Sequence, residues 1–150
     1  MASTKNILTS IHGRRLGIAG DGKLVVNGRT ATTQDDAGLE IRQQGAPAAV
    51  DVTATLTIEN LRTGIITSTT AAAVTGTLPT GTLTDAGFTN PTLAIGEAFD
   101  WSVSASGANA FTVAAGVDHT LVGSGIVATA TSSQFRTRKI AANSFTTYRI

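Results

Sequence analysis

The stretch Phe99-Asp-Trp-Ser-Val-Ser-Ala105 decides the fold class of this chain. Phe99, Trp101, Val103 and Ala105 are apolar, and each residue between them is Asp or Ser. Successive side chains of a β-strand point to opposite faces of a sheet. A period of two therefore predicts a strand with one buried face and one open face.

The same alternation runs from Val50 to Ile58, where Asp and Thr separate the apolar residues, and it predicts a second half-buried strand. Turn signals at intervals of roughly 8–12 residues are typical of a sandwich or barrel. We therefore expect an all-β fold, in which residues 47–150 form a jelly-roll-like β-sandwich of about eight strands. Since no internal repeat of fixed length is present, a propeller or solenoid is not expected. Further strands are expected at 65–70, 72–78, 111–115, 120–122, 125–131, 133–140 and 144–150, and single helical turns at 59–63 and 84–87.

Residues 1–46 predict an extended N-terminal arm with one short hairpin. Asp21-Gly22 lies between the apolar runs Leu16–Ile18 and Leu24–Val26, which is a strong hairpin signal. Asn27-Gly28 is a second turn signal. The segments on either side are polar or irregular, so we expect 1–15 and 30–46 to be extended and to lie on another surface.

Composition excludes several classes of protein. The chain has 150 residues, enough for one domain with a sizeable core, and its formal net charge is only +1. A nucleic-acid binder usually has a strong basic excess. The absence of cysteine rules out disulfides and thiolate metal sites, and fits assembly in a reducing cytoplasm. No apolar run approaches the roughly 20 residues of a membrane-spanning helix.

Two stretches resemble nucleotide-binding motifs, but their context does not fit. Gly17–Lys23 has the spacing of a P-loop, yet Leu24 follows where Ser or Thr should hold Mg²⁺. A strand pattern, and no helix, follows it. Gly123–Ala128 fits the loose dinucleotide fingerprint, but it also continues into a Thr-rich strand pattern and lacks the βαβ unit. A hairpin and a strand are the preferred interpretations.

The sequence predicts no catalytic, cofactor-binding or metal-binding residue, and we expect that the protein is not an enzyme. A zinc site needs three or four ligands, and the chain has two histidines, His12 and His119. We expect His12 to be an arm contact and His119 to lie in a loop or at a rim. No Gly-x-Ser-x-Gly elbow is present. Glu97 and Asp100 leave open a glycan-degrading enzyme, although acids in loops are the preferred interpretation.

The end of the chain is basic. Residues 126–150 contain four bases and no acid. Arg136 and Arg138 have the same parity in a predicted strand, so their side chains share a face. With Lys139 they predict a basic surface for an acidic protein, nucleic acid or glycan. The alternative is a solvated strand face that pairs in part with the chain's own acids.

Three stretches together carry a family resemblance: Leu8-Thr-Ser-Ile-His-Gly-Arg-Arg-Leu-Gly17, Ile95-Gly-Glu-Ala-Phe-Asp-Trp-Ser102, and Phe135-Arg-Thr-Arg-Lys139 with Phe145-Thr-Thr-Tyr-Arg-Ile150. The chain resembles capsid cement or decoration proteins of tailed bacteriophages, which have a jelly-roll body. The resemblance implies a virion protein on the outer surface of an HK97-type shell, where it clamps neighbouring major capsid subunits after assembly in the host cytoplasm. It also implies a homo-oligomer, dimer or trimer, without cofactor, nucleic acid or membrane as partner.

On this hypothesis several residues are candidate contacts to the major capsid protein. An alternative function is a phage fibre or receptor-binding β domain that recognises a host glycan or protein. The candidate contacts are Ile11, Arg14, Arg15, Arg136, Arg138 and Lys139.

Overall fold

A computed structural model describes residues 44–89 and 92–150 in full, and six short strands between residues 9 and 41 as backbone. The chain divides into two compact units, Met1–Gln43 and Gln44–Ile150. The second unit is called the body below. The division lies within a few residues of the boundary expected at residue 46.

The first unit contains a four-stranded antiparallel sheet in the order β1-β2-β3-β4. Strands β2 and β3 pair antiparallel, with Gly17 opposite Val25, so the hairpin predicted around Asp21-Gly22 is confirmed. Its turn residues, like Asn27-Gly28, lie outside the described residues. The strands of this unit are β1 (Thr9–Ile11), β2 (Arg14–Ile18), β3 (Leu24–Val26) and β4 (Arg29–Thr30), and a separate pair, β5 (Thr33–Gln34) and β6 (Glu40–Ile41).

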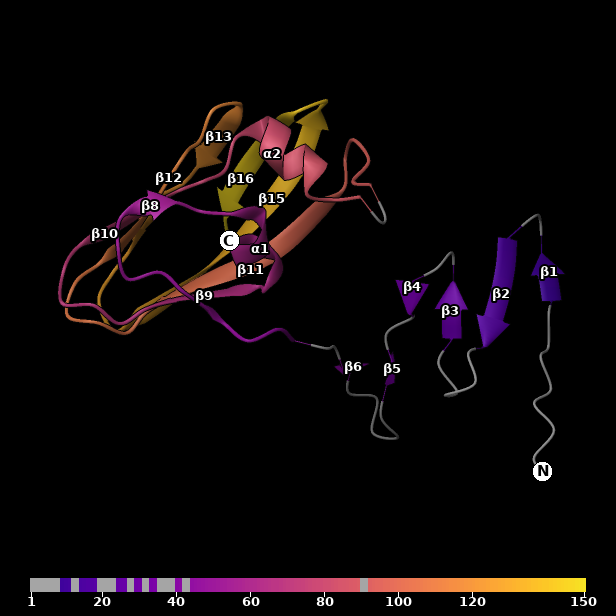
Figure 1. Cartoon of the computed structure of the whole chain (residues 1–150), viewed down its shortest axis with the longest axis horizontal. Coiled ribbons are helices and arrows are strands. Elements are labelled where there is room, and N and C mark those ends of the chain that lie inside the picture. Colours follow the sequence, from indigo (N-terminus) through magenta and orange to yellow (C-terminus); the bar gives the residue numbers. More distant parts are fainter. Residues whose placement is uncertain are drawn as a thin grey trace. The chain divides into compact units, whose positions relative to one another are not determined.

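The body is mostly β, as the sequence predicts, and its strands form two sheets (Figure 1). The six-stranded sheet has the order β13-β16-β15-β11-β9-β7 and the four-stranded sheet the order β14-β12-β10-β8. Two short helices, α1 (Ile58–Arg62) and α2 (Gly81–Ala86), confirm the predicted helical turns. The strands are β7 (Ala48–Ala49), β8 (Ala54–Thr55), β9 (Ile65–Ser68), β10 (Val74–Thr77), β11 (Ala98–Ala105), β12 (Phe111–Ala114), β13 (His119–Val122), β14 (Ile126–Val127), β15 (Thr131–Ala141) and β16 (Ser144–Arg149).

Consecutive strands of the body alternate between the two sheets, except for the hairpin β15–β16. Neighbours such as β9 and β11, or β10 and β12, are parallel as a result. A parallel pair needs a long crossover connection, and here a strand of the opposite sheet supplies part of it. Jelly rolls are antiparallel, so this pairing does not confirm a jelly roll. The chain passes repeatedly from one sheet to the other, with α1 between β8 and β9 and α2 between β10 and β11.

The predicted strand from Val50 to Ile58 is wrong. The chain leaves one sheet after Ala49 and joins the other at Ala54, so Val52 between them is 71% exposed. Two polar residues of this alternating pattern form hydrogen bonds that a strand would not provide. The Asp51 carboxylate accepts the Thr69 backbone N–H at 2.7 Å. Thr57 caps α1 in a capping box with Asn60, which starts a helix where the pattern predicts a strand.

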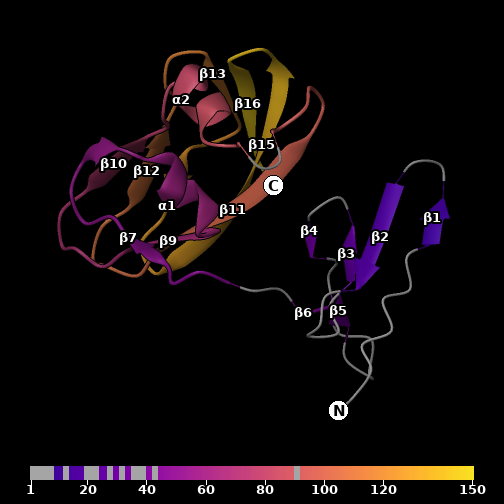
Figure 2. The same cartoon turned by 45° about the vertical axis from the view of Figure 1, so that its right-hand side comes forward.

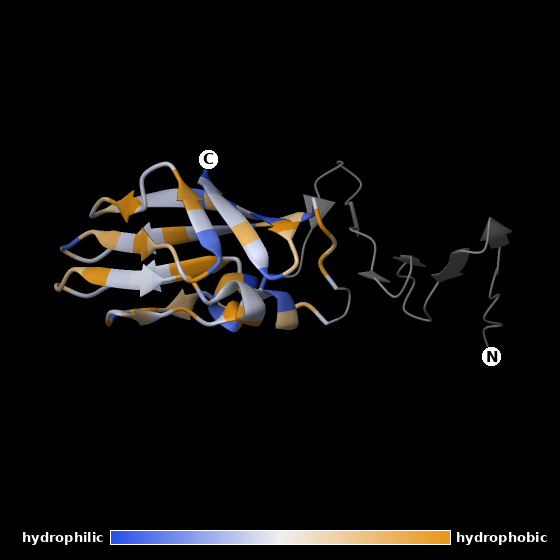
Figure 3. Ribbon diagram, turned by 90° about the horizontal axis from the view of Figure 1, so that it is seen from above, coloured by the Kyte–Doolittle hydropathy of each residue, from blue (hydrophilic) through white to orange (hydrophobic). Residues whose placement is uncertain are grey.

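The core between the sheets contains the predicted alternation of Phe99–Ala105. Trp101, Val103 and Ala105 are fully buried, and the Trp101 ring stacks on Phe135 of the neighbouring strand with centroids 4.7 Å apart. Hydrophobic and hydrophilic bands therefore alternate along the strands (Figure 3). Burial of two large aromatic rings from adjacent strands makes β11 and β15 the centre of the core. The other buried hydrophobics packed in this cluster are Val50, Leu56, Leu61, Ile66, Val74, Leu78, Phe111, Val113 and Val127.

The turn from β14 to β15 offers a test of the fold. Ala130 has φ +56°, a left-handed conformation that costs a residue with a Cβ about 1–2 kcal/mol. Ala130→Gly should raise the free energy of unfolding by up to about 1 kcal/mol, because glycine's greater freedom in the unfolded chain offsets part of the relief. Urea unfolding monitored by the fluorescence of Trp101 measures it.

The matched control is Ala128→Gly in the same turn, since Ala128 is exposed and is not among the residues with positive φ. This change should lower stability by roughly 0.5–1 kcal/mol. Equal shifts of the same sign in both variants would contradict the described turn.

Candidate functional site

One face of the six-stranded sheet presents a polar surface, built by the outward side chains of β11 and β15. We call it the open face. Burial alternates along both strands, so that these side chains are exposed or half-buried while their neighbours point into the core. The antiparallel register places Asp100 opposite Arg136 and Ser102 opposite Gln134. The open face consists of Asp100, Ser102, Ser104, Ser132, Gln134, Arg136 and Arg138.

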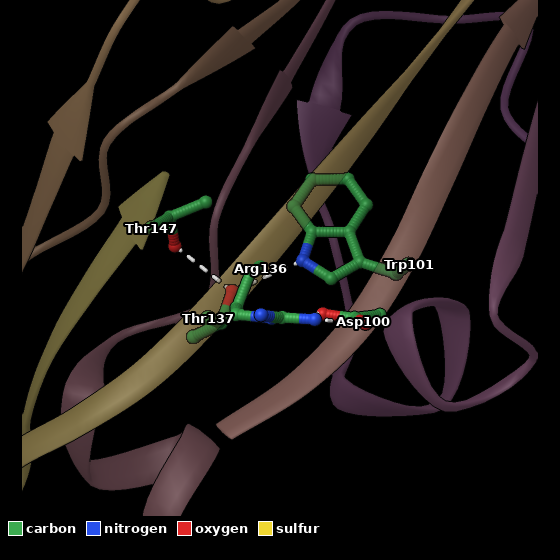
Figure 4. Close-up of polar contacts among 5 residues, drawn as sticks. All are labelled: Asp100, Trp101, Arg136, Thr137 and Thr147. Carbon is green, nitrogen blue, oxygen red and sulfur yellow. Dashed lines mark hydrogen bonds and ion pairs between the residues drawn. The ribbon is translucent and has the colours of Figure 1, made fainter. Parts of the chain in front are cut away.

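Arg136 and Asp100 form a bidentate ion pair across the two strands (Figure 4). Arg136 Nε and one terminal nitrogen donate to the two carboxylate oxygens of Asp100, each at 2.7 Å. The hydrogen bonds and the negative charge of Asp100 raise the pKa of Arg136 above its usual value. Because both side chains are well exposed, solvent screens the pair and it adds little stability. The two hydrogen bonds instead fix the orientation of the planar Arg136 guanidinium on the open face.

A shallow hollow lies beside this pair on the open face. It is lined by Asp100, Ser102, Ser132 and Gln134, with Gln44 at its margin. A second hollow continues along the strands past Ser104, Ser106 and Thr131. Hydroxyls, an amide and a guanidinium are thus spread along two adjacent strands.

A buried chain of polar groups holds the strands beneath the open face together (Figure 4). Trp101 Nε1 donates to Thr137 Oγ1 at 3.0 Å, and Thr137 Oγ1 lies 2.9 Å from Thr147 Oγ1. Thr137 and Thr147 are completely buried. An indole N–H can only donate, so the Thr137 hydroxyl accepts that bond, and either hydroxyl can be the donor in the bond between Thr137 and Thr147. We call this the hydroxyl chain; it joins β11, β15 and β16 side by side.

The structure separates the predicted basic residues of β15. Arg136 and Arg138 share the open face, as their parity predicts. Lys139 points the other way, and its side chain is only 12% exposed. Its ammonium forms an ion pair with Asp85 of α2 and donates to the Leu93 carbonyl oxygen at 3.0 Å. This lysine is thus bound within the body and lies apart from the two arginines.

The candidate contacts of the first unit lie on two paired strands. Ile11 of β1 pairs with Arg14 of β2, and Ser10 pairs with Arg15. The backbone therefore brings the three predicted residues into one hairpin. His12 lies outside the described residues.

The remaining sequence candidates also have definite places. Glu97 accepts the Ala94 backbone N–H at 2.9 Å in a tight turn, and Asp100 is bonded to Arg136. The residues after Gly125 form β14 and no helix, which confirms the strand interpretation of the dinucleotide-like stretch. Within the described residues no group of three metal-ligating side chains is present. No helix in the described part of the chain is long and apolar enough to span a membrane.

The environment of His119 differs from the one that the sequence predicts. His119 was expected in a loop or at a rim, but it lies in β13, is 8% exposed and stacks on Phe145. Its Nε2 lies 3.1 Å from Thr84 Oγ1 of α2. The sequence does contain an indication of this position. His119 and Leu121 alternate with Thr120, so in a strand the His119 side chain lies on the same face as the apolar Leu121.

Comparison with known proteins finds no match: no family model, no curated protein and no solved structure is similar to this chain.

Substitution of two adjacent residues of β15 should affect stability to very different degrees. Thr137→Val leaves the Trp101 N–H and the Thr147 hydroxyl without a buried partner, and should lower the free energy of unfolding by about 1–3 kcal/mol. Arg136→Ala removes an exposed ion pair and should change stability little. Urea unfolding at neutral pH measures both variants.

Thr137→Ser is the matched control, because it keeps the hydroxyl and removes one methyl group. It should cost less stability than Thr137→Val. If the serine and valine variants are equally destabilised, packing of the side chain, and not the hydroxyl chain, stabilises these strands.

Proposed function

We propose that this chain is a structural virion protein, a cement protein that binds the outside of an HK97-type shell and clamps neighbouring major capsid subunits. The observation that carries the proposal is the open face, a broad polar sheet surface with a fixed arginine at its centre. On this proposal the open face lies on the shell, and the protein is found on the outer surface of the virion.

The fixed arginine and the short side chains of the open face support a protein partner. Arginine is enriched in the cores of protein interfaces, and the Asp100 pair holds Arg136 in one orientation before binding. Ser102, Ser104 and Ser132 are short, so they lose little rotamer freedom when a partner covers them. The hydroxyl chain beneath keeps the strands in register. A surface prepared in this way loses less entropy on association than one of long flexible side chains.

The division into two units supports a clamp. If Ile11, Arg14 and Arg15 bind one capsid subunit and the open face binds another, the second contact becomes intramolecular and the two affinities multiply. A closed homo-oligomer, dimer or trimer, would repeat both contacts around a symmetry axis. The jelly-roll topology implied by the resemblance remains a prediction, and the proposal does not depend on it.

The open face generates one test of this proposal. Arg138→Glu should weaken binding to expanded shells at least about tenfold, because it places a negative charge against the acidic surface that the proposal requires. Arg62→Glu on α1 is the charge-matched control and should bind normally. Sedimentation of shells with titrated protein gives both affinities. Equal binding by wild type and Arg138→Glu would exclude the open face as the contact surface.

The first unit generates a second test. Deletion of residues 1–15 removes β1 and the start of β2, and should lower the apparent affinity for shells by about a hundredfold through loss of the second contact. The same sedimentation experiment measures it. Unchanged binding would remove the first unit from the proposal while leaving the role of the open face intact.

Copy number on purified particles tests the class of function itself. A cement protein is present at a fixed ratio to the major capsid subunit. A few copies per particle, together with binding to host glycan, would instead support the fibre or receptor-binding alternative.

A further inference from the structure

Helix α2 is attached to the end of the six-stranded sheet through polar side chains. It lies beside β13 and β16 in two views (Figures 1 and 2). Its only buried residues are Gly81 and Thr84, and its largest apolar side chain, Leu83, is 58% exposed. Hydrophobic burial therefore contributes little to the docking of this helix. Polar contacts hold it in place: the Gly81 backbone N–H donates to the Val117 carbonyl oxygen at 2.9 Å, and the side chains of Thr84 and Asp85 make one contact each with the sheet.

The contact of Thr84 fixes the tautomer of His119. The Thr84 hydroxyl donates its single proton to the Thr80 carbonyl oxygen at 3.0 Å, because a carbonyl can only accept. Thr84 Oγ1 must then accept at its contact with His119 Nε2, 3.1 Å away. His119 therefore carries a proton on Nε2, and in the neutral ring this is the one N–H. Its Nδ1 is left as a buried acceptor without a partner among the described residues.

Protonation of His119 is unfavourable in this position. The new N–H on Nδ1 would be buried without an acceptor, which costs free energy. Burial lowers the pKa of His119 below its usual value of 6.5, and the nearby Asp118 carboxylate opposes that shift only in part. The ring also stacks on Phe145, with centroids 5.2 Å apart, which keeps water from one face of the imidazole.

We propose that His119 and Thr84 form an acid-sensitive latch, in which protonation of His119 releases α2 from β13 and β16. The released histidine reaches water and takes up a proton that the docked histidine excludes. Release therefore becomes easier as the pH falls below 6.5, and the docked state is fully retained above that pH. This inference is independent of the proposed virion function.

The second contact of α2 does not titrate in the same pH range. Asp85 forms an ion pair with Lys139 and accepts the Asn143 backbone N–H at 3.0 Å. The bond from Lys139 lowers the pKa of Asp85 below its usual value of 3.8, so this contact persists at pH 5. The other charged residue on the packed strands, Arg149 of β16, is bonded to the carbonyl oxygens of Ser124 and Ile126. Because the Asp85 contact persists at pH 5, the pH dependence of α2 release comes from His119.

Release of α2 would alter the surface of the body. Phe145 is completely buried in the docked state, where His119 covers its ring. Movement of His119 and α2 would give this ring access to solvent at the end of the sheet. The latch would then expose an apolar side chain only at acidic pH.

Amide hydrogen exchange of the full chain tests the latch. The N–H groups of Thr84 and Gly87 donate within α2, and their protection should be compared with that of Phe135 at pH 7.5 and pH 5, after correction for intrinsic exchange rates. Relative protection of α2 should fall by up to about thirtyfold, the limit set by an unfolded histidine pKa of 6.5. In His119→Gln, whose amide can still donate to Thr84, the ratio should not depend on pH.

Two further measurements keep the inference testable if His119→Gln does not fold. NMR titration of His119 in the wild type should give a pKa below 6.5, and a pKa at or above 6.5 would overturn the latch. Asp85→Asn should weaken α2 protection at both pH values while preserving the fall between them. A wild-type ratio that does not change with pH, or an equal fall in His119→Gln, would also overturn it.

Discussion

The hydroxyl chain from Trp101 through Thr137 to Thr147 is the constraint on which the rest of the body depends. It is buried, it crosses three neighbouring strands, and each of its groups would be costly to leave unpaired. Because it fixes β11 against β15, it also fixes which residues face each other on the outside. The opposition of Asp100 to Arg136 is a consequence of that register. Through Thr147 the hydroxyl chain also fixes β16 beside β15. Strand β16 in turn pairs with β13, where His119 lies opposite Phe145.

The part of the fold that follows from local periodicity could be predicted. The alternation from Phe99 to Ala105 is borne out because β11 stays in one sheet for its whole length. The alternation from Val50 to Ile58 looks the same in sequence, but here the chain crosses from one sheet to the other. The apolar residues of this crossing are therefore not all buried, and Val52 is exposed. The parallel pairing of β9 with β11 and of β10 with β12 could not be predicted. These strands are far apart in sequence, and no local pattern indicates that they are neighbours.

The candidate site could likewise be predicted only in part. The shared face of Arg136 and Arg138 follows from the period of two alone. The separate environment of Lys139 needs knowledge of Asp85, which is 54 residues away in sequence and belongs to a helix at the end of the sheet. His119 could have been placed by parity. Its partner Thr84 could not, because no local pattern relates α2 to β13.

The alternation of strands between the sheets has a consequence for synthesis of the protein. Strand β15 joins β11 to β16, and β16 is the neighbour through which β13 belongs to the six-stranded sheet. While the ribosome is still adding these last strands, the sheet lacks its middle, and Trp101 and Phe111 have an incomplete core around them. Strands β7, β9 and β11 can pair in the order in which they emerge, but β13 has no partner in the six-stranded sheet until β16 is made. Until β15 and β16 complete the sheet, the edge of β11 that β15 covers is open, and an unpaired strand edge is prone to aggregation.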